Sequence, residues 1–293
     1  MNPRMLSPIA VVPRRSLLYM PGANARALEK AQGLDCDTII FDLEDAVAPD
    51  SKALARSQVL AALASHHYGH RELIVRCNGL DTPWGQDDLE AFANSPIDGL
   101  LFPKIENQDQ VAAIKSLLQT CGSKLPLWLM IETPTAVLRL EEFGGDEEVA
   151  ALVMGTSDLV KELRGQHTPA RHNLAYALQR CVLTARMLGK EIFDGVHLDF
   201  RNLPELRDAC EAGRAMGFDG KTLIHPDQVP IANEVFGYSP EAVAQAKAIL
   251  EVWQEALAQG KGVAELDGQL IENLHAHEAQ RVVAFGQALR RRG

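Results

Sequence analysis

The sequence has few cysteines and no apolar run long enough to span a membrane. Its five cysteines are widely separated and form no CxxC pair: Cys36, Cys77, Cys121, Cys181 and Cys210. Scattered thiols predict reduced side chains in the cytoplasm rather than a disulfide framework or a Cys-ligated metal. The short apolar piece near the N-terminus is interrupted by Pro8 and Pro13, which argues against a signal peptide. We therefore expect a cytoplasmic protein that makes no membrane contact.

Positively charged residues are fewer than acidic ones, and several familiar motifs are absent. The chain carries 29 Lys and Arg against 39 Asp and Glu, a net charge of −10, which argues against a nucleic-acid-binding surface. No GxGxxG or Walker loop is present, and Ser157 in "GTSDL" lacks the GxSxG elbow of serine hydrolases. The absence of a His/Cys cluster makes zinc an unfavourable choice of metal.

Short apolar runs that alternate with helix-like segments are abundant. The runs cover residues 16–20, 38–43, 72–77, 99–103, 125–131, 150–155, 192–198 and 221–226. Eight β–α repeats within 293 residues predict a closed (β/α)8 TIM barrel, an α/β fold, with an open doubly wound sheet as the alternative.

The remaining chain has a different pattern. After residue 236 the strand-like runs stop, residues 239–258 predict a long helix, and a glycine-bearing link leads to a last helix over 269–290. We expect a catalytic barrel over 1–230 and a C-terminal helical extension over 231–293, acting as a lid or an oligomer contact.

Acidic residues gather where the predicted strands end, which is where TIM barrels place their active sites. The stretch "TIIFDLEDAV" places Asp42, Glu44 and Asp45 there, Glu132 ends strand five and Asp158 follows strand six. Asp42 comes before the end of its strand, so we expect it to be structural. Converging carboxylates repel one another, and a divalent cation with oxygen ligands relieves the repulsion.

Glu132 and Asp158 are therefore the candidate ligands for Mg2+, with Mn2+ as an alternative ion. Arg76, which ends strand three, would supply a fixed positive charge for an anionic substrate. An acidic residue at the end of a strand, taken alone, is more often a helix cap or an ion-pair partner than a metal ligand. Lys104 could form a Schiff base or neutralise Glu132. The hypothesis rests on the convergence of these residues.

Seven ordered motifs carry a resemblance over about residues 14–236. They are "RRSLLYMPGANARALEKA", "IIFDLEDAVAPDSKALAR", "LIVRCNGLDTPWGQDDL", "GLLFPKIE", "MIETPTAV", "MGTSDL" and "GFDGKTLIHPDQV". Together they resemble the citrate lyase beta-subunit-like family of the HpcH/HpaI aldolase superfamily, which includes malyl-CoA and citramalyl-CoA lyases. The resemblance implies a TIM barrel that assembles as a homotrimer or a multiple of trimers.

The resemblance also implies roles for individual residues. Glu132 and Asp158 match residues that hold Mg2+, and Arg76 matches a substrate-binding arginine. Glu44 and Asp45 match residues that line the metal-bound water shell and orient the site. Pro134, in "MIETPTAV", is grouped with the substrate-binding residues.

CoA contacts and a second acid–base group are expected from the same resemblance. Arg15, Lys52 and Arg56 lie inside matched motifs and are the predicted contacts for the CoA phosphates. Asp267, in "AELDGQLIE", matches an aspartate that covers a neighbouring subunit's active site, although the residues after it, Gln269 and Leu270, depart from the family's pattern.

The implied activity is Mg2+-dependent cleavage of a 3-hydroxyacyl-CoA, citramalyl-CoA or malyl-CoA, to acetyl-CoA and pyruvate or glyoxylate. Asp267 would then protonate the acetyl-CoA enolate. The alternatives are a malyl-CoA thioesterase, a citrate lyase beta subunit acting on citryl-acyl-carrier protein, a cofactor-free aldolase acting on free 2-keto acids, and a non-catalytic homologue.

Overall fold

The structure is a computed structural model that describes residues 11–65 and 67–292. The described chain forms two compact units. The larger contains residues 14–236, and the smaller contains residues 237–292 together with residues 11–13.

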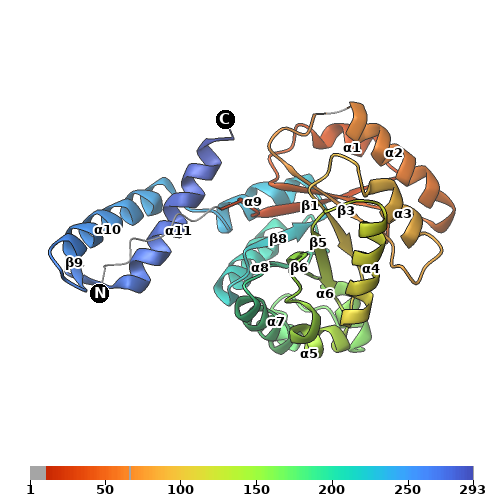
Figure 1. Cartoon of the computed structure of the whole chain (residues 1–293). Coiled ribbons are helices and arrows are strands. Elements are labelled where there is room, and N and C mark those ends of the chain that lie inside the picture. The colour runs from red at the N-terminus through yellow and green to blue at the C-terminus, as the bar shows by residue number, and fades with distance from the viewer. Residues whose placement is uncertain (1–10, 66, 293) are drawn as a thin grey trace. The chain divides into compact units, whose positions relative to one another are not determined.

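The larger unit is a closed parallel barrel of eight strands in sequence order (Figure 1). The strands are β1 (Ser16–Pro21), β2 (Thr38–Asp42), β3 (Glu72–Arg76), β4 (Gly99–Phe102), β5 (Leu127–Ile131), β6 (Val149–Met154), β7 (Glu191–Asp194) and β8 (Gly220–Leu223). The barrel closes where Leu17 of β1 pairs with Thr222 of β8. The predicted TIM barrel is confirmed, and the open doubly wound alternative is wrong.

Helices connect the strands and surround the barrel (Figure 1). They are α1 (Ala25–Ala31), α2 (Lys52–Ser65), α3 (Gly85–Phe92), α4 (Gln108–Thr120), α5 (Pro134–Phe143), α6 (Thr156–Glu162), α7 (Ala175–Leu188), α8 (Leu203–Met216) and α9 (Val229–Val235), with 3₁₀ turns η1 (Pro49–Ser51), η2 (His172–Leu174) and η3 (Pro226–Gln228). None of the described helices is both long and apolar enough to cross a membrane.

The alternation of side chains along each strand builds two separate apolar layers. In β2, Ile39 and Phe41 belong to the large core between barrel and helices, whereas Ile40 belongs to the core inside the barrel. Inside the barrel, the rings of Trp128 and Phe193 stack with centroids 5.2 Å apart. Because both faces of each strand are buried, the strands read as continuous apolar runs.

An arginine closes the end of the barrel at which the strands begin. The Arg14 guanidinium pairs with Glu72 and Glu191, the first residues of β3 and β7, and lies 5.2 Å above the Trp128 ring. This ionic cluster stabilises the floor of the barrel and leaves the opposite end for the site.

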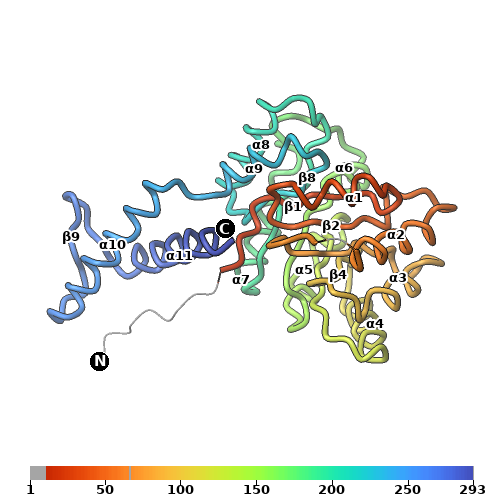
Figure 2. Tube along the Cα trace, turned by 90° about the horizontal axis from the view of Figure 1, so that it is seen from above, coloured from red at the N-terminus to blue at the C-terminus, as the bar shows by residue number. Residues whose placement is uncertain are grey.

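The smaller unit contains two long helices and a short hairpin. They are α10 (Pro240–Ala258), β9 (Ala264–Leu266), β10 (Gln269–Ile271) and α11 (Asn273–Arg290). Helices α10 and α11 run side by side (Figures 1 and 2) and bury Val243, Ala246, Ala279 and Val282 between them.

The hairpin was not expected, because the sequence predicted a link followed by a helix from residue 269. Its strands have three residues each, which is too short for a periodicity to be recognised. The turn that joins them is Asp267–Gly268, with φ of 51° and 77°. An Asp-Gly pair suits this turn because both residues tolerate positive φ.

Candidate active site

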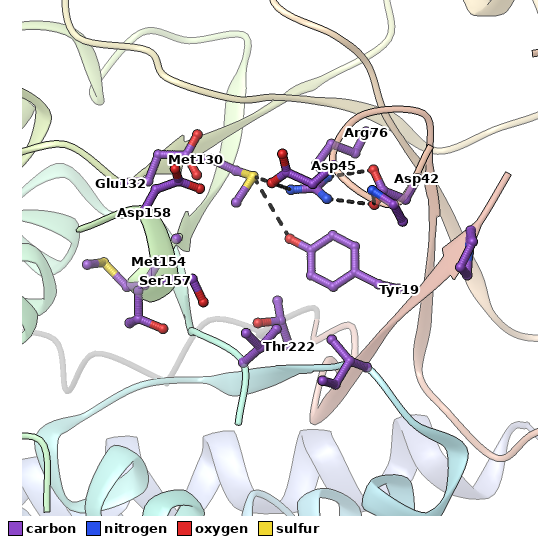
Figure 3. Close-up of a pocket in the computed structure, with 16 residues that line it drawn as sticks. Tyr19, Asp42, Asp45, Arg76, Met130, Glu132, Met154, Ser157, Asp158 and Thr222 are labelled. Carbon is purple, nitrogen blue, oxygen red and sulfur yellow. Dashed lines mark hydrogen bonds and ion pairs between the residues drawn. The ribbon is translucent and has the colours of Figure 1, made fainter. Parts of the chain in front are cut away.

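A pocket of about 340 Å³ opens at the end of the barrel where the strands finish (Figure 3). Its lining comes from six strands (β1, β2, β3, β5, β6 and β8) and from segments that follow strands, including the one after β7: Tyr19, Pro21, Asp42, Asp45, Ala46, Arg76, Met130, Glu132, Met154, Gly155, Thr156, Ser157, Asp158, Val196, Thr222 and Ile224. Figure 3 shows Glu132 and Asp158 on one side of the pocket and Arg76 with Asp42 on the other. The structure therefore brings Arg76, Glu132 and Asp158 together, as predicted.

Arg76 is buried and its orientation is fixed by carboxylates from the preceding strand and loop. Its Nε and Nη2 donate to the two carboxylate oxygens of Asp42, at 2.7 and 2.6 Å. Its Nη1 lies 3.0 Å from Glu44 and 3.6 Å from Asp45. Burial is the largest single influence and opposes the charge, but the neighbouring groups, Asp42 foremost and Glu44 among them, together outweigh burial and keep the pKa of Arg76 well above its ordinary value. Arg76 is thus a paired cation rather than a free one.

Asp42 is a site residue that sequence reasoning treated as structural. Besides binding Arg76, it accepts the backbone N–H groups of Glu44 and Ala46, at 2.9 and 3.2 Å, and so holds the loop after β2. The signal that could have identified it is the strand register, because Asp42 and Arg76 are direct neighbours across β2 and β3. Asp42 therefore positions both the arginine and the loop that carries Glu44 and Asp45.

Glu132 is held in the pocket by the backbone around it. It is 2% exposed, and its Oε1 accepts the backbone N–H of Lys104 at 2.8 Å. Gly155 makes room for it, since a Cβ there would lie 2.4 Å from both the Cβ and Oε2 of Glu132. Burial, reinforced by Glu44 and Asp158, raises the pKa of Glu132 to about 7. A nearby cation would relieve this cost of ionisation.

Asp158 lies in the first turn of α6, directly after β6, and its side chain is one-fifth exposed. Lys161 is 3.9 Å away. Among the described residues, no three His, Cys, Asp or Glu side chains are grouped to hold a metal. Two carboxylates fit Mg2+, which takes one or two protein ligands and keeps several waters. The donor chemistry of Glu132 and Asp158 thus fits the expected ion.

Lys104 has a left-handed backbone with φ of 53°, which is rare for a residue with a side chain. This conformation aims its N–H at Glu132. Burial opposes its charge, but Glu44, Asp158 and Glu132 raise the pKa of its ammonium group. Lys104 thus orients Glu132 through its backbone N–H and places a positive charge near Glu44, Asp158 and Glu132.

Glu44 and Asp45, the acidic pair expected to support the site, differ in environment. The Glu44 side chain is 13% exposed, and burial raises its pKa to about 7 although Arg76 acts in the opposite direction. The Asp45 side chain is 60% exposed and lines the pocket mouth. Glu44 therefore changes protonation near neutral pH.

Of the three predicted CoA contacts, Lys52 and Arg56 both contact Trp84, whereas Arg15 lies apart from them. Arg15 precedes β1 and binds Asp37 through both carboxylate oxygens at 2.8 Å, at the end of the barrel opposite to the pocket. The Lys52 ammonium donates to the carbonyls of Leu43 and Glu44, at 2.8 Å each. The contact of Arg15 and Lys52 with CoA stays a prediction that their surroundings do not support.

Two further predicted residues do not line the pocket. Arg56, on α2, binds the buried Asp88 at 2.9 Å and the exposed Asp87 at 3.2 Å. Pro134 is the first residue of α5, two positions after Glu132. Neither side chain belongs to the pocket lining, so their roles as CoA or substrate contacts also stay predictions.

The smaller unit contains Asp267, which is exposed at the hairpin turn between β9 and β10. The turn itself accounts for an aspartate there, because Asp tolerates positive φ. Its proposed acid–base role stays a prediction.

Asp194 and His225 at the rim have structural partners. Lys221 and Arg171 bind the buried Asp194 at 2.8 and 2.7 Å, and His225 Nδ1 accepts the N–H of Asp227 at 3.2 Å. Tyr19, by contrast, lines the pocket and was not predicted. It could have been found from the alternation in β1, because Leu17 faces the barrel interior and Tyr19 is two residues further on.

Comparison with known proteins identifies the family. The model for HpcH/HpaI aldolase/citrate lyase matches residues 15–226. A (3S)-malyl-CoA thioesterase of Cereibacter sphaeroides is 47% identical over 277 residues, covering 94% of this chain and 96% of the relative. Citrate lyase subunit beta of Escherichia coli is 33% identical over 267 residues, 88% of each chain.

A solved structure agrees with the sequence relatives. CitE from Mycobacterium tuberculosis, in complex with magnesium, acetoacetate and coenzyme A, is 25% identical with a TM-score of 0.73. The match covers 95% of this chain and 97% of the CitE chain. The resemblance found from the sequence motifs is confirmed, and the chain belongs to the HpcH/HpaI aldolase/citrate lyase family.

Proposed function

We propose that this protein is a Mg2+-dependent enzyme that hydrolyses the CoA thioester of a short 2-hydroxy dicarboxylic acid, as in malyl-CoA. The observation that carries the proposal is that Glu132 and Asp158 line the same pocket as Arg76 and its partner Asp42. The (3S)-malyl-CoA thioesterase, similar over nearly the whole of both chains, supports the substrate class and the choice of hydrolysis.

Glu132 and Asp158 would hold the metal through their carboxylate oxygens, with Mn2+ as the alternative ion. A bound Mg2+ supplies Lewis-acid polarisation of the substrate's hydroxyl and carboxylate oxygens. Because the Lys104 N–H donates to Glu132, this proposed ligand is held in position without the ion. The magnesium bound in the related CitE structure supports this assignment.

Glu44 would handle the proton in hydrolysis. A water molecule adds to the thioester carbonyl, the carbon–sulfur bond breaks, and the CoA sulfur leaves with a proton. A carboxylate whose pKa is about 7 can accept the water proton and then return it to the sulfur. Asp42 keeps Arg76 beside Glu44, so that positive charge stays next to the group that changes protonation.

Carbon–carbon cleavage is the second candidate. The citrate lyase beta relatives and the CitE complex with acetoacetate and CoA favour it. Cleavage of malyl-CoA or citramalyl-CoA would give acetyl-CoA and glyoxylate or pyruvate, with Asp267 protonating the enolate. We also propose that the catalytic barrel spans residues 1–230, that residues 231–293 form the extension, and that a homotrimer brings Asp267 to a neighbouring subunit.

Product analysis separates the two reactions. The purified protein with Mg2+ and (3S)-malyl-CoA should release free CoA thiol and malate in equal amounts, without acetyl-CoA. Acetyl-CoA and glyoxylate in equal amounts would instead establish the lyase. Neither product from folded, Mg2+-loaded protein would contradict the proposed function.

Two variants make the test specific to the pocket. Glu132→Gln removes a proposed ligand charge and should lower turnover by about 100-fold or more, with weaker Mg2+ binding. The matched Glu29→Gln, on the exposed face of α1, should retain full activity. Unchanged Mg2+ affinity in Glu132→Gln would contradict the metal assignment.

A further inference from the structure

The Tyr19 hydroxyl lies in the pocket and has no strong acceptor among the described residues. The residue is near the end of β1, and its side chain lines the cavity beside Met130 and Arg76 (Figure 3). Within residues 11–65 and 67–292, its hydrogen-bond partner is Met130 Sδ, at 3.9 Å. A thioether is a weak acceptor, so this contact leaves the hydroxyl available as a donor.

The ring of Tyr19 packs against the guanidinium group of Arg76. The guanidinium carbon of Arg76 lies 4.8 Å from the ring centroid, a cation–π contact. Arg76 itself directs Nε and Nη2 at Asp42, so those two donors do not serve a substrate oxygen. The Tyr19 hydroxyl is therefore a neutral donor in the pocket next to an arginine whose charge is already paired.

The phenol remains protonated in the pH range where the enzyme would work. Burial raises the pKa of Tyr19 above its ordinary value, and although Arg76 opposes this rise, Asp42 and Glu132 reinforce it. A protonated phenol can donate to an oxygen on which negative charge develops.

We propose that Tyr19 is a catalytic residue whose hydroxyl donates a hydrogen bond to the thioester carbonyl oxygen of the substrate. The inference rests on the proposed function and holds for both candidate reactions, because hydrolysis and carbon–carbon cleavage each place negative charge on that oxygen. The bond strengthens as this charge develops, so it favours the transition state over the bound substrate.

Tyr19→Phe tests the hydroxyl alone, because it keeps the ring and the contact with Arg76. With (3S)-malyl-CoA and saturating Mg2+, we expect kcat to fall by about 10- to 100-fold while KM changes by less than about threefold. Mg2+ affinity and the melting temperature should match those of the parent. Tyr68→Phe is the control, since it removes a buried hydroxyl that donates to the Leu28 carbonyl at 3.1 Å and lies outside the pocket lining.

The outcomes distinguish the inference from the function on which it rests. A parent protein that turns over malyl-CoA together with a Tyr19→Phe variant of equal kcat would overturn the role of Tyr19 alone. Equal losses in Tyr19→Phe and Tyr68→Phe would also overturn it, because the loss would then follow from any buried hydroxyl. A parent that forms no product overturns the proposed function and the inference with it.

Discussion

Arg76 and Asp42 form a two-pronged hydrogen bond, 2.7 Å from Nε to Oδ1 and 2.6 Å from Nη2 to Oδ2, at the ends of neighbouring strands. They are register partners across β2 and β3, so closure of the barrel brings them together. Bidentate pairing of this kind fixes the plane of a guanidinium as well as its position. The remaining terminal nitrogen, Nη1, is thereby directed at Glu44.

Asp42→Asn should therefore damage both stability and activity. The substitution keeps the size of the side chain but leaves Arg76 buried with less compensating charge. We expect the free energy of unfolding to fall by about 3 kcal/mol, and kcat/KM to fall by about 10- to 100-fold. Urea denaturation and steady-state kinetics would measure the two effects.

Asp87→Asn is the matched control for that experiment. Asp87 also pairs with an arginine, Arg56, but at 3.2 Å and with 64% of its side chain exposed. An exposed pair of this kind contributes less than about 1 kcal/mol. Equal destabilisation by both substitutions would contradict the special role given to the Asp42 pair.

Gly155→Ala should weaken metal binding without touching a ligand. The new Cβ would lie 2.4 Å from the Cβ of Glu132 and must displace that side chain. Mg2+ affinity measured by calorimetry should fall by about tenfold or more. Gly262→Ala, where an added Cβ meets no atom within 4 Å, should bind Mg2+ like the parent; similar affinities in both variants would disprove the packing argument.

Mg2+ affinity should rise with pH through the neutral range. Glu132 must lose its proton to bind the ion, and burial raises its pKa to about 7 in the metal-free protein. The dissociation constant should therefore fall by about tenfold between pH 6 and pH 8. Calorimetry in buffers of different ionisation enthalpy should detect the released proton, and equal affinity at both pH values would refute the expectation.

The raised pKa of Glu132 also makes the stability of the protein depend on pH. The raised pKa means that the folded state binds the Glu132 proton more tightly than the unfolded chain, whose value is the ordinary 4.5. This stabilisation is complete below about pH 4.5 and is lost as the pH rises through about 7. Mg2+ should restore stability above that pH, which melting curves with and without the ion would record.

Lys104→Gly and Lys104→Ala should separate the backbone of this residue from its side chain. Both variants lose the ammonium group and keep the N–H that Glu132 accepts. Only glycine adopts φ of 53° without strain, so Lys104→Gly should be more stable than Lys104→Ala by about 1 kcal/mol. Coincident urea unfolding curves for the two variants would show that the left-handed backbone carries no strain.

Much of the fold followed from the sequence because buried parallel strands are continuous apolar runs separated by helices. The gathering of Glu132 and Asp158 followed from the rule that parallel strands end on one rim. The pairing of Arg76 with Asp42 did not, because it depends on the register of two strands that are far apart in sequence.

Proximity in sequence was misleading for Arg15. It lies in the same motif as Tyr19 and Pro21, yet it precedes β1, whereas they lie toward the far end of the strand. A six-residue strand separates those ends by about 20 Å. Arg15 therefore binds Asp37 at the floor of the barrel, and the motif alone could not distinguish the two ends.

Asp267→Asn should distinguish the two candidate reactions. Asn tolerates positive φ nearly as well as Asp, so the turn with Gly268 and the melting temperature should be preserved. Only the enolate route needs a proton delivered to carbon. If the parent forms acetyl-CoA, that activity should therefore fall by about 100-fold, whereas thioester hydrolysis should stay within about threefold. Exchange of the acetyl-CoA methyl protons with deuterated water, followed by NMR with Mg2+ and CoA ester present, reports the carbon acid–base step independently. If Asp267→Asn loses the exchange but keeps hydrolysis, Asp267 takes part in enolate chemistry. If the exchange is unchanged, the aspartate is explained by the hairpin turn alone.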